Sequence, residues 1–197
     1  MRNAGCSRYI DKVSEGDICQ ILEAQAAETL AVFQRISDGQ SLHRYAAHKW
    51  SIRETVSHAN DTERLFVSRA FWFARGFDTA LPSFDQDTAI GVAGADERSW
   101  ISHVDEFRAV RSATLAFFLN LPHQAWVRRG IASENPFTVR ALAYITAGCG
   151  IGRRSASESG RLRHGDGAPR KGRALPVAAN IDYALASSIT MTGSRFT

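Results

Sequence analysis

The residues whose types and spacing could do chemistry lie together in the stretch 49–64 of this 197-residue chain. His58 is followed by Asp61 three residues later, by Thr62 four residues later and then by Glu63. An imidazole and carboxylates this close along a chain can serve as ligands of a divalent metal ion. The alternative for His58 is a polar helix residue that forms a hydrogen bond with a neighbour. His58 is therefore the first candidate ligand of the chain.

The two carboxylates of this stretch allow two interpretations. Asp61 or Glu63 could complete a ligand set or orient His58, because metal-bound imidazoles donate their second N–H to a carboxylate. Glu63 also falls on the apolar face of its helix, where an unpaired charge is costly, so it needs a partner or a metal. The alternative is an ordinary ion pair with Arg64 or Arg69. Both interpretations remain open at the level of sequence.

The same stretch predicts the helix that must position His58. Ser51 and Glu54 have the spacing of a capping box, in which each side chain accepts the other residue's backbone N–H. Apolar residues then recur at three- and four-residue steps, which predicts one buried face of a helix over 51–75. These residues are Ile52, Val56, Ala59, Phe66, Ala70 and Phe73.

Three further amphipathic segments predict helices over about 15–37, 97–120 and 138–149. The segment 76–96 contains glycines and a proline and predicts a long irregular crossover between the second and third helices. The segment 126–136 predicts a short loop. No stretch shows the sustained alternation of a sandwich. The fold class expected is all-α, a four-helix bundle with a long crossover between helices two and three.

Composition limits the remaining possibilities. Residues 1–148 carry 16 Lys and Arg against 17 Asp and Glu, whereas residues 149–197 carry 8 against 3, so the positive excess lies in the tail. The region 151–197 is rich in Arg, Gly and Ser without periodicity, which predicts a disordered tail. The chain has no apolar run long enough for a membrane span or a signal peptide, and three widely spaced cysteines suggest no disulfide framework. We expect a cytoplasmic protein that binds neither a membrane nor nucleic acid.

Several blocks of residues between about 8 and 148 resemble the DinB-like family in their order and spacing. The resemblance implies a bacterial four-helix bundle, often dimeric, that holds a divalent metal ion (Ni, Zn, Mn or Fe). Its ligands would be one histidine of the second helix and a His-x-x-x-His pair of the fourth. The blocks are Arg8-Tyr-Ile-Asp11, Glu15-Gly-Asp17, Lys49-Trp-Ser-Ile-Arg-Glu54, His58, Asp61-Thr-Glu-Arg64, Ala74-Arg-Gly76, Leu81-Pro82, Phe84-Asp-Gln-Asp87, Thr138-Val-Arg-Ala-Leu-Ala-Tyr144 and Ala147-Gly148.

His58 matches the second-helix histidine of the family, but the fourth helix departs from the pattern. Where the pair is expected, this chain has Cys149 and, four residues later, Arg153. A cysteine thiolate can bind metal, whereas arginine has no lone pair to donate; the alternative for Cys149 is a small buried side chain. The metal ligands expected here are thus His58 and Cys149. The abrupt departure is interpreted as a shift of reading frame near codon 149.

The family resemblance implies metal-assisted activation of a low-molecular-weight thiol or of water, which we expect to be impaired by the missing pair. The alternative is a non-catalytic bundle that acts by dimerisation or protein contact. The other histidines of the bundle region are expected at the surface, and the aromatic residues of the helices in the core or in a dimer contact. These histidines are His43, His48, His103 and His123, and the aromatic residues are Trp50, Phe66, Phe71, Trp72, Phe73, Phe117 and Phe118.

Overall fold

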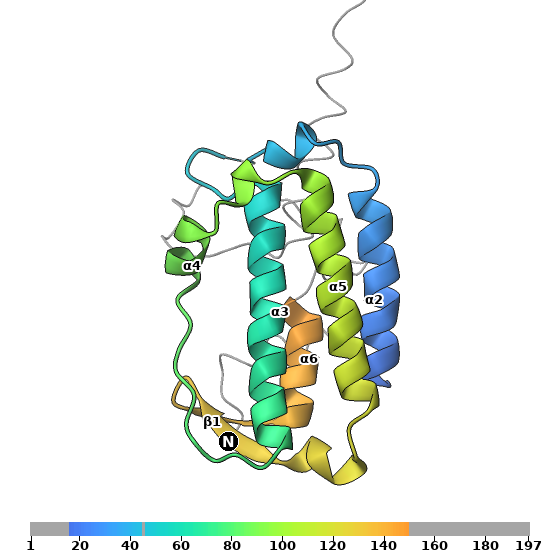
Figure 1. The fold of residues 1–197 in the computed structure, drawn as a ribbon, viewed down its shortest axis with the longest axis vertical. Helices are drawn as coiled ribbons and strands as arrows, with labels where there is room; N and C mark the ends of the chain where they lie inside the picture. The colour runs from blue at the N-terminus through green and yellow to red at the C-terminus, as the bar shows by residue number, and fades with distance from the viewer. Residues whose placement is uncertain (1–15, 45, 150–197) are drawn as a thin grey trace, which may run out of the picture.

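The structure is a computed structural model and describes residues 16–44 and 46–149. Its four long helices form the expected all-α bundle (Figure 1): α2 (Ile18–Phe33), α3 (Ile52–Ala74), α5 (Trp100–Leu119) and α6 (Val139–Cys149). The shorter elements are α4 (Gln86–Val92), strands β1 (Arg129–Ala132) and β2 (Asn135–Thr138), and 3-10 turns at Gln40–Leu42, Ala95–Glu97 and His123–Val127. Among the residues described, no helix combines the length and apolar character needed to cross a membrane. The region 151–197, predicted to be disordered, lies outside the described residues.

Side-chain caps begin the helices. The Asp17 side chain accepts the Cys19 N–H at 2.8 Å and starts α2. At the start of α3 the capping box is complete: Ser51 Oγ accepts the Glu54 N–H at 3.0 Å, and Glu54 Oε2 accepts the Ser51 N–H at 2.7 Å. Thr138 Oγ1 accepts the Ala141 N–H at 3.0 Å and caps α6. These caps satisfy backbone donors that have no partner within the helix, which fixes where each helix begins.

The fourth helix packs against the lower part of the bundle. Helix α6 is described over Val139–Cys149, up to the last residue that the structure describes, and in Figure 1 this part lies beside the lower half of α3. Arg128 at the base of the hairpin donates to the Ala74 carbonyl, so α6 starts beside the end of α3. Gln25 Nε2 donates to the Ala147 carbonyl at 3.3 Å, which places the end of α6 against the middle of α2. The described part of α6 therefore packs between the end of α3 and the middle of α2.

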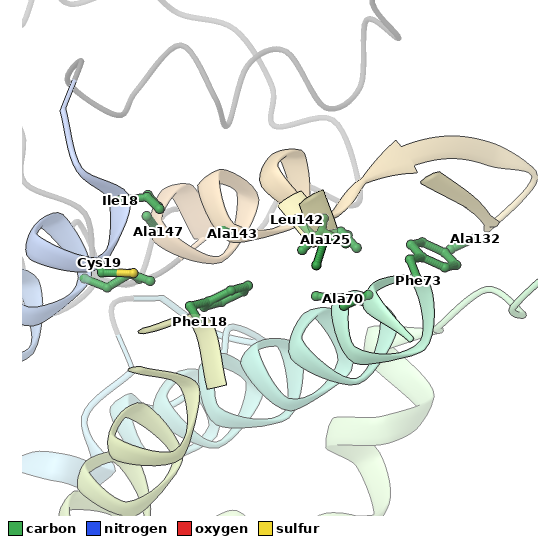
Figure 2. Packing of buried hydrophobic residues seen from close by; sticks show 13 residues of the cluster. Ile18, Cys19, Ala70, Phe73, Phe118, Ala125, Ala132, Leu142, Ala143 and Ala147 are labelled. Carbon is green, nitrogen blue, oxygen red and sulfur yellow. The ribbon is translucent and has the colours of Figure 1, made fainter. Parts of the chain in front are cut away.

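The apolar core consists of two separate clusters. Figure 2 shows the lower cluster, in which Leu142 and Ala143 of α6 face Ala70 of α3 and Phe118 of α5. The upper cluster joins residues of α2, α3 and α5. Of the aromatic residues expected in the core or in a dimer contact, Phe73 and Phe118 are buried in the core, whereas Phe71 is 42% exposed. The upper cluster consists of Phe33, Ile36, Ile52, Val56, Trp100, Val104 and Phe107.

A buried ion pair links the helices in the middle of the bundle. Arg111 of α5 donates from Nε and Nη2 to the two oxygens of Glu63 at 2.9 and 2.8 Å. Its third nitrogen, Nη1, donates to the Leu22 carbonyl of α2 at 2.9 Å. The carboxylate that the sequence placed on an apolar face thus has its partner on α5. One guanidinium group holds three helices together.

Two segments predicted to be irregular contain short regular elements. The crossover 76–96 includes α4, which Asp85 caps by accepting the Thr88 N–H at 2.8 Å. The segment expected to be a loop before α6 forms an antiparallel hairpin, in which Arg129 pairs with Thr138 and Ala132 with Asn135. Its two turn residues have φ values of 49° and 62°, which non-glycine residues seldom adopt. Residue types alone gave no sign of this turn, because Ser133 and Glu134 replace the usual glycine or asparagine.

The expectation that His103 lies at the surface is wrong. This residue of α5 is fully buried, and its Nε2 lies 2.8 Å from the Ala95 carbonyl in the turn that precedes α5. Its Nδ1 has no hydrogen-bond partner in the described part of the chain. The crossover covers a helix face that the periodicity of α5 alone would leave exposed.

Removing one partner of the central ion pair should destabilise the bundle strongly. Glu63→Ala leaves the Arg111 guanidinium buried without its counter-charge, and we expect a loss of about 3–5 kcal/mol in the free energy of unfolding. Denaturant unfolding monitored by circular dichroism measures it. The matched control is Asp105→Ala, which breaks the exposed Asp105–Arg108 pair and should cost less than about 1 kcal/mol. Equal losses in the two variants would contradict the central role of the pair.

The buried imidazole of His103 should make stability depend on pH. Burial lowers the pKa of His103; Arg98 and Arg53 also lower it, while the Ala95 hydrogen bond and Glu106 oppose them. The unfolded chain therefore binds more protons than the folded one below about pH 6.5, so stability falls as the pH drops from there towards the folded pKa.

Replacing His103 with Gln, whose amide can still donate to Ala95, should reduce this effect. We expect the free energy of unfolding to fall less between about pH 7.5 and 5.5 in His103→Gln than in the wild type. The exposed His123→Gln is the control and should behave as the wild type. An unchanged pH profile in His103→Gln would disprove the prediction.

Candidate metal centre at His58

His58 lies near the start of α3, half-buried. Its ring packs against Trp50, with 4.9 Å between the ring centroids and 55° between the planes. Thr62 Oγ1 lies 3.4 Å from both Nδ1 and Nε2, at the outer limit of hydrogen bonding. A hydrogen-bonding neighbour, the alternative considered for His58, is thus present but weakly bound. No firm hydrogen bond holds either ring nitrogen, so the nitrogen that carries the lone pair is available to a metal ion.

The electrostatic surroundings keep this imidazole neutral yet attractive to cations. Burial lowers the pKa of His58, and the negative charges of Asp61 and Asp87 partly oppose that shift. A neutral imidazole has a lone pair to donate, which a protonated one lacks. Asp87 belongs to α4, so the crossover brings this second carboxylate into the electrostatic range of His58.

The carboxylates of α3 are engaged elsewhere. Asp61 forms an ion pair with Arg64, with 3.3 Å between Oδ1 and Nη1. Both oxygens of Glu63 accept from Arg111. Ion pairing, the second interpretation that the sequence left open, therefore accounts for both residues. Glu63 pairs with neither of the two arginines considered from sequence.

The described residues do not by themselves fit a catalytic metal ion. Among the side chains of residues 16–148, Tyr45 excepted, no three of His, Cys, Asp or Glu come together in a group that could hold one. A catalytic zinc site normally has three protein ligands and one open position. Cys149 ends α6, and its side chain lies outside what the structure describes. Of the two expected ligands, His58 and Cys149, the structure describes the side chain of His58 alone.

Two residues around this region were missed by sequence reasoning. Arg111 follows Phe107 by four residues and precedes Thr114 by three, so it interrupts the buried stripe of its helix. A charged residue at such a position needs a counter-charge, so the sequence did indicate Arg111 as a partner for Glu63. Asp87 gave no such signal, because periodicity does not encode the path of a crossover over a helix.

Comparison with known proteins agrees with this architecture. The solved structure of YfiT from Bacillus subtilis is similar, with a TM-score of 0.63, 13% sequence identity, and coverage of 90% of this chain and 87% of that chain. YfiT is described as a probable metal-dependent hydrolase with an unusual four-helix bundle topology. The comparison with curated proteins found no match. The model of the DinB superfamily matches residues 21–148, and the chain therefore belongs to the DinB superfamily.

Proposed function

We propose that this chain binds a divalent metal ion at His58 with an incomplete ligand set. The observation that carries the proposal is a neutral, half-buried imidazole whose two nitrogens lack a firm hydrogen bond, beside the negative charges of Asp61 and Asp87. Membership of the DinB superfamily and the likeness to YfiT support a metal in general. The ions considered are Ni, Zn, Mn and Fe.

The chemistry that we propose for the superfamily scaffold is activation of water or of a low-molecular-weight thiol. A bound metal ion would supply Lewis-acid activation. We propose that this chemistry is impaired here, because the described residues around His58 supply no further imidazole, whereas a catalytic site needs three protein ligands. Cys149 is the proposed second ligand, and Arg153 in the sequence cannot be a third because guanidinium has no free lone pair.

Metal content of the purified full-length chain tests the proposal. After loading with each ion and dialysis, we expect less than one ion per chain, because an incomplete ligand set holds metal weakly. His58→Ala should abolish the bound fraction. The matched control is His123→Ala, an exposed histidine of the turn before β1, which should retain it. Elemental mass spectrometry gives the stoichiometry.

Metal content unchanged by His58→Ala would refute the assignment. Protein that stays metal-free while folded and dimeric in light scattering would instead favour the non-catalytic alternative. The surface that we propose for such a contact is an aromatic patch on the outer face of α3 and α5. There the exposed Phe71 lies 6.4 Å from Phe117 between ring centroids, and the Arg75 guanidinium lies 5.5 Å from the Phe71 ring.

A further inference from the structure

Arg69 of α3 is a buried cation without a counter-charge. It is 5% exposed, and its Nη2 donates to the Pro82 carbonyl at 2.7 Å and to Ser133 Oγ at 3.0 Å, both neutral acceptors. The two other arginines buried as deeply in the described part of the chain each pair with a carboxylate. Arg111 pairs with Glu63 at 2.8 Å, and Arg53 with Asp38 at 2.7 Å. Arg69 alone among these three lacks an anion.

This arrangement is energetically unfavourable unless an anion completes it. A buried charge is tolerated when it is paired, and a guanidinium stays protonated at every physiological pH. Burial lowers the pKa of Arg69, and no described carboxylate offsets that effect. The described partners of this cation are therefore two neutral oxygens and the face of the Phe66 ring, 6.0 Å from Cζ to the ring centroid, and none of them carries a negative charge.

A second unsatisfied donor lies one helical turn away. Arg69 Nε and Trp72 Nε1 are both buried and have no acceptor within the described residues. Residues three apart share one side of a helix, and these two contact the same crossover. Arg69 binds the Pro82 carbonyl, while the Trp72 ring stacks on Phe77 with 4.2 Å between centroids and 28° between planes. Two N–H groups that can only donate thus lie under one segment.

We propose that Arg69 and Trp72 form a binding site for the carboxylate of a small molecule, at the end of α3 beneath the crossover. A carboxylate has one negative charge to balance one guanidinium and two oxygens to accept the two N–H groups. Phosphate fits less well, because its charge of about −1.5 to −2 at neutral pH exceeds the single positive charge. The Ser133 hydroxyl, which accepts from Arg69, keeps its own O–H for a third contact.

Two further features of the site are the neighbouring Phe77 side chain and the distance of Arg69 from His58 along α3. Phe77 is 46% exposed and stacked on Trp72, so the described crossover residue next to the Trp72 ring faces solvent. Arg69 follows His58 by eleven residues, which corresponds to about 16 Å along the helix axis. The carboxylate site is therefore separate from His58, and its test does not depend on metal binding.

Indole N–H resonances report directly on this site. The chain has four tryptophans, and in a two-dimensional 1H–15N spectrum the Trp72 signal is identified by its loss in Trp72→Phe. Titration with acetate against chloride at constant ionic strength should shift the Trp72 indole signal until it saturates. The Trp100 indole, which donates to the Phe33 carbonyl at 3.2 Å, should stay in place. A Trp72 signal that does not respond to acetate overturns the proposal.

Substitutions at the two donors distinguish acetate binding at this site from a general effect of salt on the spectrum. Arg69→Gln should abolish the saturable shift, while the control Arg75→Gln, an exposed arginine of the same helix end, should preserve it. An equal response of these two variants contradicts the site. If Arg69→Gln does not fold, Trp72→Phe decides through acetate-dependent thermal stabilisation, with apparent affinity expected to fall about fivefold or more. Unchanged affinity in Trp72→Phe, or tighter binding of phosphate than of acetate by the wild type, overturns the carboxylate assignment.

Discussion

The bidentate pair between Glu63 and Arg111 is the interaction on which the rest of the bundle depends. It lies between two apolar clusters, and both oxygens of the carboxylate accept hydrogen bonds from one guanidinium. Because Arg111 also donates to the Leu22 carbonyl, α2, α3 and α5 are held at one relative height. Apolar contacts alone tolerate sliding of one helix along another, whereas a fork of hydrogen bonds between buried charges fixes the register.

This constraint also determines which way His58 faces. The two residues are five positions apart on α3, so their side chains point about 140° apart around the helix axis. With Glu63 directed at α5, His58 is turned towards Trp50 and the negative charge of Asp87 on the crossover. The interactions that stabilise the bundle and the side chain that could bind metal are therefore on different faces of α3.

Local features of the fold could be predicted from the sequence, and features that depend on distant segments could not. The caps at Asp17, Ser51 and Thr138 involve residues two or three positions apart, so their residue types suffice. The burial of His103 depends on the crossover passing over α5, and the carboxylate near His58 comes from that same segment. For the candidate site, sequence and family resemblance predicted His58 as a ligand, and that stays a prediction; they did not show that Glu63 is already bound to Arg111.

X-ray absorption fine structure of the zinc-loaded full-length chain tests the central claim most directly, because it counts the imidazole groups that coordinate the metal. The fold described here, in which His58 stands without a second histidine ligand among the described residues, predicts one imidazole per bound zinc ion. Two or three imidazoles per zinc would contradict the incomplete site.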